Sequence, residues 1–156
     1  MKLNRIIGGL LFGLTVLGMS SCKDFLNRPS EDTYNTSNFY LNDEQCIQGV
    51  NYLYNSPWYD FQRACINIGE VLSGNMYWGS CPYLTFTTNA TDVDLVNMSY
   101  SLWAVNGHAN AVIVNITAAE GPSKAIKEQC LGEAITLKAL AYFFMVRTFG
   151  EVPIVH

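Results

Sequence analysis

Apolar residues recur at steps of three and four along most of the chain after residue 40, which is the spacing of a helix face rather than of a strand. The pattern predicts helices over residues 42–55, 56–74 and 91–116, each opened by a residue that can cap a helix. The predicted caps are Asn42, Ser56 and Thr91. In the first helix, Gln45 stands at the capping-box position. We therefore expect an all-α fold.

A fourth predicted helix, within residues 128–153, is the one on which the fold is centred. Its second half, 139–146, is apolar almost all round, and this run is far shorter than the ~20 residues that a membrane span needs. We therefore expect a central helix packed on several sides rather than a membrane span. Ser123 is placed to cap its start, and Gly150 is placed to end it in a left-handed conformation.

Residues 74–91 have no helical period, and their Gly, Pro and Asn content predicts a loop with a short extended piece at 83–87. An aromatic ring offers a flat apolar face to a sugar ring, and an amide group can both donate to and accept from hydroxyl groups. The candidate ligand-binding residues in this loop are Asn75, Tyr77, Trp78, Tyr83 and Asn89. The alternative is that the aromatic residues pin the loop to the core.

The chain has 156 residues, 49% hydrophobic content and a net charge of −4, which fits one domain with a buried core. No basic patch with interleaved aromatic residues is present, so we expect no nucleic-acid partner. With only two histidines, no C-x-x-C and no nucleophile or phosphate-loop motif, we expect no metal, no cofactor and no enzymatic activity. Asp92 and Asp94 could form a glycosidase pair, but acids at a helix start are far more often caps.

Four cysteines follow Cys22, at positions 46, 65, 81 and 130, and they allow three pairings in an exported chain. Cys46, Cys65 and Cys130 each fall on an apolar helix face, where a free cysteine behaves as a small hydrophobic residue. We therefore expect buried thiols rather than disulfides.

The N-terminus has the pattern of an export signal. Lys2 and Arg5 flank the start of a short apolar run, and small residues lead up to Cys22. A Cys directly after small residues resembles a bacterial lipobox, in which the Cys becomes the lipidated first residue of the mature protein. We expect a signal peptide over 1–21, lipid attachment at Cys22 and a polar tether over 22–40. The alternative is a plain secretory signal followed by an incidental Cys.

The fourth predicted helix also carries an ordered set of residues that extends past its end. These residues are Glu133-Ala134, Leu137-Lys138-Ala139, Ala141-Tyr142-Phe143, Arg147 and Phe149-Gly150-Glu151-Val152-Pro153. The set resembles a helix of the SusD/RagB family, the surface nutrient-binding lipoproteins of Bacteroidetes, with Lys138 in place of the family's usual Arg. Trp103 and Asn110 in the preceding helix are similar to the family's W-x6-N pattern.

The resemblance implies a tetratricopeptide-like helical array. It also implies a lipoprotein on the surface of the outer membrane that captures glycan, sometimes peptide, and covers a TonB-dependent, SusC-like transporter. The alternative is a helical-repeat scaffold lipoprotein that binds only protein partners. Family members are several times longer, so we expect residues 41–156 to be an incomplete N-terminal helical domain of a truncated or partial product. Such a domain would expose apolar surface around Phe143, Phe144 and Val146.

Overall fold

The computed structural model describes residues 38–55, 58, 61–77, 79 and 81–156, and every regular element in these residues is helical. The elements are α3 (Asp43–Asn51), η1 (Tyr52–Tyr54), α4 (Phe61–Ile66), η3 (Asn67–Val71), α5 (Val93–Ala118) and α6 (Lys124–Phe149). The expected all-α fold is confirmed. The predicted signal peptide, Cys22 and most of the tether lie outside the described residues, as do Ser56 and Trp78.

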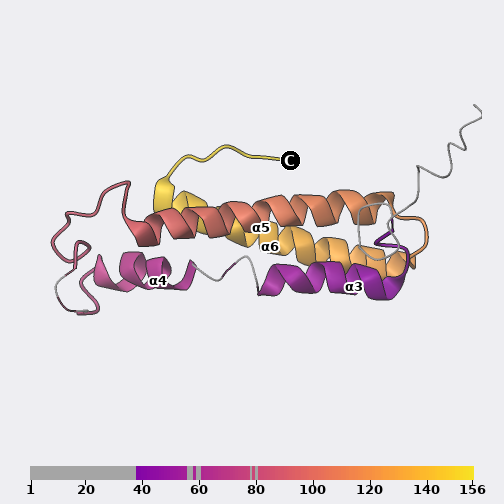
Figure 1. Ribbon diagram of the computed structural model, residues 1–156, viewed down its shortest axis with the longest axis horizontal. Helices are drawn as coiled ribbons and strands as arrows, with labels where there is room; N and C mark the ends of the chain where they lie inside the picture. The colour runs from indigo at the N-terminus through magenta and orange to yellow at the C-terminus, as the bar shows by residue number, and fades with distance from the viewer. Residues whose placement is uncertain (1–37, 56–57, 59–60, 78, 80) are drawn as a thin grey trace, which may run out of the picture. The chain divides into compact units, whose positions relative to one another are not determined.

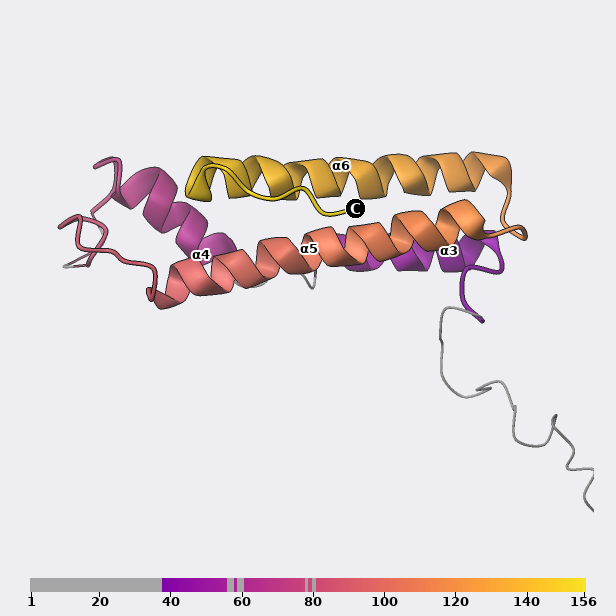
Figure 2. The ribbon, with the colours of Figure 1, turned by 90° about the horizontal axis from the view of Figure 1, so that it is seen from above.

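The two longest helices, α5 and α6, form an antiparallel hairpin, and α3 and α4 lie end to end along it (Figures 1 and 2). Side-chain bonds join α3 and η1 to α6 at two levels. The Asp43 carboxylate accepts hydrogen bonds from the backbone N–H (2.6 Å) and hydroxyl (2.9 Å) of Ser123, and the Tyr54 hydroxyl donates to Glu133 (2.9 Å). These three bonds, at opposite ends of α3–η1, define its register along α6.

The buried apolar residues form two clusters that share the α5–α6 hairpin. The first joins α3 and η1 to the hairpin and consists of Cys46, Val50, Leu53, Ala109, Val112, Ile116, Cys130, Ala134 and Leu137. The second joins α4 to the hairpin and consists of Ala64, Met98, Leu102, Val105, Ala141 and Met145. Both clusters include residues of α5 and α6, so the hairpin is the common packing partner of the shorter helices.

The cysteines bear out part of the expectation from the sequence. Cys46 and Cys130 are fully buried, and burial raises the pKa of both thiols. Cys65 and Cys81 are half-buried, and all four are free thiols. The prediction of a buried thiol is therefore confirmed for two positions and too strong for Cys65.

The helix ends follow the predicted caps with one correction. The Asn42 side chain accepts from the backbone N–H of Gln45 (3.0 Å), as a capping residue does. The Gln45 side chain accepts from the backbone N–H of Leu41 (2.7 Å), one residue before the N–H that a capping box uses. The cap of α5 is Asp92 rather than Thr91. Thr91 was the wrong choice because its hydroxyl donates instead to Asn89 (2.6 Å).

Ser123 and Gly150 stand at the predicted ends of α6, but Ser123 does not cap the helix with its side chain. Ser123 is the N-terminal flanking residue, yet its hydroxyl makes no capping bond within α6 because it donates to Asp43. Gly150 ends the helix with a φ of +78°, which a residue with a Cβ rarely adopts. The chain after Gly150 then turns back along the hairpin (Figure 2).

Among the described residues, no helix packs on the face of α6 that points away from α5. Its buried stripe consists of Cys130, Ala134, Leu137, Ala141 and Met145. Ile135, Phe143 (51% exposed) and Val146 (54% exposed) lie on the outer face, whereas Phe144 packs against Phe61 with ring centroids 4.5 Å apart. The expectation of a helix packed on several sides is thus met toward α5, α3 and α4, but not on this outer face.

Length and composition alone would let α6 cross a membrane, and it is the one helix in the described residues that meets this test. Central helices of other folds pass the same test. Here the helix packs along α5 and α3 and carries the acceptor for Tyr54 at Glu133. Packing within the chain is therefore what the structure shows for this helix.

We expect the purified chain to self-associate through this outer face, because contiguous exposed apolar surface is removed from water when two copies meet. Replacing Phe143 with Glu should shift the population toward monomer in analytical ultracentrifugation. Tyr100→Glu is the matched control, since Tyr100 is exposed on α5. A wild-type chain that is strictly monomeric and melts in one cooperative transition would contradict this expectation.

Candidate ligand-binding loop

The loop between η3 and α5 lies at the end of the hairpin where α5 begins (Figure 1). Its first part folds back on η3, because the backbone N–H groups of Asn75 (2.9 Å) and Met76 (3.1 Å) both donate to the carbonyl of Glu70. Its middle part is a series of turns over residues 82–86, closed by a bond from Thr87 N–H to the Pro82 carbonyl (2.9 Å). The predicted extended piece at 83–87 is therefore absent, because this hydrogen bond closes a turn over these residues.

Tyr83 anchors the loop to the first turn of α5. Its side chain is 3% exposed, and its hydroxyl donates to Asp92 Oδ1 (2.7 Å). The same oxygen accepts from the backbone N–H groups of Asp94 (3.0 Å) and Leu95 (3.1 Å). One carboxylate thus caps α5 and holds the loop at the same time.

The protonation equilibria of this pair are both shifted. Burial raises the pKa of Tyr83, and the bond to the Asp92 carboxylate raises it further. Burial would also raise the pKa of Asp92, but the bonds that it accepts from Tyr83, Leu95 and Asp94 outweigh that effect and lower it. The pair is therefore held as a neutral tyrosine beside an ionised carboxylate.

Asp94 joins α4 and η3 to the first turn of α5. Arg63 Nε lies 3.1 Å from Asp94 Oδ2, and the buried Asn67 side chain donates to that oxygen (2.9 Å). Asp92 and Asp94 both have structural partners, so neither stands as a free acid or base. Within the described residues, no group of three potential metal-ligating side chains occurs.

The structure separates the predicted site residues into two groups. Asn75 and Tyr77 stay on the surface, and the Tyr77 side chain is 81% exposed. Tyr83 is internal, and Asn89 accepts from the backbone N–H (2.9 Å) and hydroxyl of Thr91, so both shape the loop. The alternative interpretation, in which an aromatic residue pins the loop to the core, therefore holds for Tyr83, whereas Asn75 and Tyr77 stay accessible and Trp78 lies outside the described residues.

One exposed residue of the loop was not predicted. Phe86 is 77% exposed and has a φ of +55°, a conformation that residues with a Cβ rarely adopt. It lines a cavity of about 280 Å³ together with Tyr83, Thr88, Ile68, Leu72, Leu95 and Thr148. A single Phe among turn residues looks like a core anchor in the sequence, so only the folded structure reveals that Phe86 is exposed.

Comparisons with known proteins agree on one relationship. The chain is 34% identical over 152 residues to a protein of Bacteroides ovatus described as "SusD-like protein", covering 94% of this chain and 28% of that one. A solved crystal structure superposes with a TM-score of 0.69 at 32% identity, over 75% of this chain and 24% of that chain. No protein-family model matches the chain. The chain therefore spans about a quarter of the length of these proteins.

We expect Tyr83→Phe to lower the free energy of unfolding at pH 7 by about 1–2 kcal/mol, because Asp92 loses its hydroxyl donor. The raised pKa of folded Tyr83 means that the unfolded chain loses this proton first, so its contribution is full below pH ~10 and falls as the pH rises further. Urea unfolding between pH 8 and 11 should therefore show a smaller alkaline loss in the variant.

The lowered pKa of Asp92 gives the opposite dependence. Its stabilising contribution is present above the unfolded value of about 4 and is lost as the pH falls through the folded value.

Tyr100→Phe serves as the control for the loss of a tyrosine hydroxyl in the Tyr83→Phe experiment, because Tyr100 is exposed on α5. Equal alkaline slopes for wild type and Tyr83→Phe would refute the role given to the Tyr83–Asp92 bond.

Proposed function

The chain is SusD-like in both sequence and fold, and on this premise we propose that it is part of a nutrient-binding lipoprotein of the cell surface. Its partner would be a TonB-dependent, SusC-like transporter of the outer membrane, and its ligand an oligosaccharide. The homology supports the class of protein, and the exposed aromatic and amide side chains of the loop support the ligand.

The loop has the features of a sugar-contacting surface. Tyr77 and Phe86 present exposed rings, and Asn75 adds an exposed amide beside Tyr77 in the sequence. Flat apolar rings cover the apolar face of a pyranose, and amides pair with its hydroxyl groups. The bond between Tyr83 and Asp92 ties the loop that bears these side chains to α5. A loop held in one conformation loses less conformational entropy when ligand binds. Trp78 and Asn89 complete the proposed set.

The lipid anchor belongs to the same proposal. Attachment at Cys22 after removal of residues 1–21 would place the helical unit on the membrane surface, since each buried CH₂ of an acyl chain contributes ~0.8 kcal/mol. Of the proposed tether 22–40, Tyr40 packs against the first cluster, so the residues before it would separate the anchor from the helices. Mass spectrometry of the membrane-extracted protein would detect the diacyl or triacyl modification.

We propose no catalytic role for the chain. The two acids at the start of α5 are engaged, Asp92 with Tyr83 and backbone N–H groups, and Asp94 with Arg63 and Asn67. A hydrolytic pair needs one carboxyl that holds a proton and one that is free to attack or to activate water. Binding without turnover is the activity that this arrangement supports.

A scaffold that binds only protein is the second candidate, and the exposed outer face of α6 is the observation that favours it. Ile135, Phe143 and Val146 form an apolar surface that a protein partner would cover. In this case the loop would play no part in binding, and the chain would co-purify with the transporter without responding to sugars.

Isothermal titration with a panel of oligosaccharides tests the proposal. We expect binding to at least one glycan, weakened about 5- to 30-fold by Tyr77→Ala, because the apolar ring area that the sugar covers is worth about 1–2 kcal/mol. Tyr100→Ala is the control for loss of an exposed tyrosine outside the loop. Co-purification with an outer-membrane barrel and no response to any glycan would favour the protein-only scaffold instead.

A further inference from the structure

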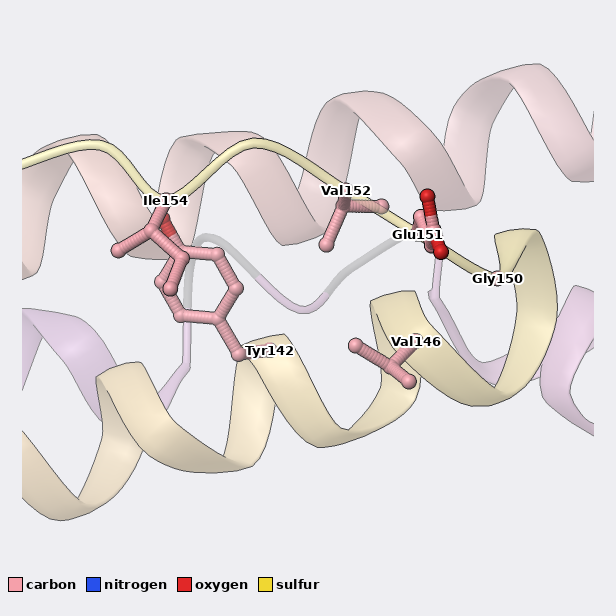
Figure 3. A pocket seen from close by; sticks show the side chains of 6 residues that line it. All are labelled: Tyr142, Val146, Gly150, Glu151, Val152 and Ile154. Atoms are coloured by element: carbon pink, nitrogen blue, oxygen red, sulfur yellow. The ribbon is translucent and has the colours of Figure 1, made fainter.

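The segment after α6, which we call the strap (residues 151–155), lies along the α5–α6 hairpin without forming a regular element of its own (Figures 1 and 2). It turns back at Gly150, whose φ of +78° reverses the chain direction. Between the strap and α6 lies a cavity of about 850 Å³ lined by Tyr142, Val146, Gly150, Glu151, Val152 and Ile154 (Figure 3). The strap therefore forms one wall of the cavity, and α6 forms the other.

Side chains of both helices bind the main chain of the strap at Val155. The backbone N–H of Val155 donates to the Tyr142 hydroxyl oxygen (2.7 Å), and its carbonyl accepts from Asn110 Nδ2 (3.2 Å) and, at longer range, from the Tyr142 hydroxyl (3.4 Å). The side chain of Ile154 is 70% exposed. What the hairpin recognises here is the polypeptide backbone rather than a particular side chain.

A second row of contacts holds Tyr142 in place for this role. Asn106 Nδ2 donates to the Tyr142 hydroxyl (3.1 Å), and the Trp103 ring meets the Tyr142 ring edge-on with centroids 6.4 Å apart. Asn106 is 2% exposed, and its Oδ1 has no hydrogen-bond partner among the described residues. Burying an amide oxygen without a hydrogen-bond partner raises the free energy of the folded state. The presence of Asn106 within an apolar hairpin therefore indicates a role other than stability, which here is to position Tyr142.

We propose that the hairpin surface under the strap, which we call the groove, is a binding site for extended polypeptide of aliphatic character, occupied in cis by the strap and available in trans to a peptide from another molecule when the strap is released. The seated strap shows the kind of ligand that fits, because its Val152 packs against the second cluster and its Val155 backbone is bound at both polar groups. This site is separate from the loop and does not depend on the proposed glycan ligand.

The strap competes with any external peptide, since a segment in the same chain has an effective concentration in the millimolar range. Val155→Pro should release it, because proline lacks the N–H that Tyr142 accepts. The probe is a fluorescein-labelled peptide with the sequence of residues 150–156, and its twin carries an N-methyl group on the valine that matches Val155. The two peptides differ only in the N–H that the groove is proposed to bind.

Fluorescence anisotropy should show the plain peptide binding the Val155→Pro chain at least ~10-fold more tightly than wild type, because the competing segment is gone. The N-methyl twin should bind about 3- to 10-fold more weakly than the plain peptide, as expected for one lost hydrogen bond. Adding Tyr142→Phe should abolish that difference, whereas Tyr52→Phe, at a tyrosine outside the groove, should preserve it. Equal binding of the two peptides, or no binding to a folded Val155→Pro chain, overturns the proposal.

Amide hydrogen exchange gives a readout that does not depend on the proline variant folding. The Val155 N–H should be protected in the wild-type chain and exchange faster in Tyr142→Phe, which lacks the acceptor. Identical exchange at Val155 in both chains would also overturn the proposal.

Discussion

The antiparallel packing of α5 on α6 is the interaction on which the other elements depend. Small side chains on the facing stripes, such as Ala109, Ala134 and Ala141, let the two helices approach closely, and Leu102 and Met145 fill the space between them. Each fully buried side chain of the larger kind contributes roughly 1.5–3 kcal/mol. Because α3 and α4 each pack on residues of both long helices, neither has a complete apolar partner without the hairpin.

Polar contacts then decide how the shorter segments attach to this hairpin. Asp43 holds the start of α6 through Ser123, and Lys127 donates to the Thr117 and Ala119 carbonyls where α5 ends. A cation at that position also complements the negative end of the helix dipole. At the opposite end of α5, Asp92 joins the loop to the helix start. The polar contacts thus fix the two ends of the hairpin, and the apolar stripes of α5 and α6 pack along its middle.

The two candidate surfaces use this scaffold in different ways. The loop displays side chains, Tyr77 and Phe86 among them, from a backbone fixed at Tyr83 and Asp92. The strap groove instead displays backbone-binding groups, with Tyr142 and Asn110 presented by two rigid helices. Within about a quarter of the length of the proteins that it resembles, the chain therefore carries two distinct candidate surfaces, one proposed for sugar rings and one proposed for polypeptide.

Local rules were enough to predict the helices and the roles of Asn42 and Gly150, because capping and chain reversal depend on neighbours within a few residues. They failed at Thr91 because a competing acceptor, Asn89, lies just outside the capping pattern. They also failed to predict that α4 would give way to the wider η3 turn over Asn67–Val71. The candidate loop was found from its composition, but its exposed and buried aromatics were not distinguished.

The sequence by itself determined that the chain is helical, where its long helices run and which family the motif in its last helix resembles. The periodicity of apolar residues and the spacing of a motif can both be read from the order of residues alone. Only the tertiary structure decided that Tyr83 turns inward while Tyr77 stays on the surface, because burial depends on Asp92 and α5 being close in space. It alone brought Asn106 and Asn110 to Tyr142 and the strap, through a pairing of helices that local sequence does not encode.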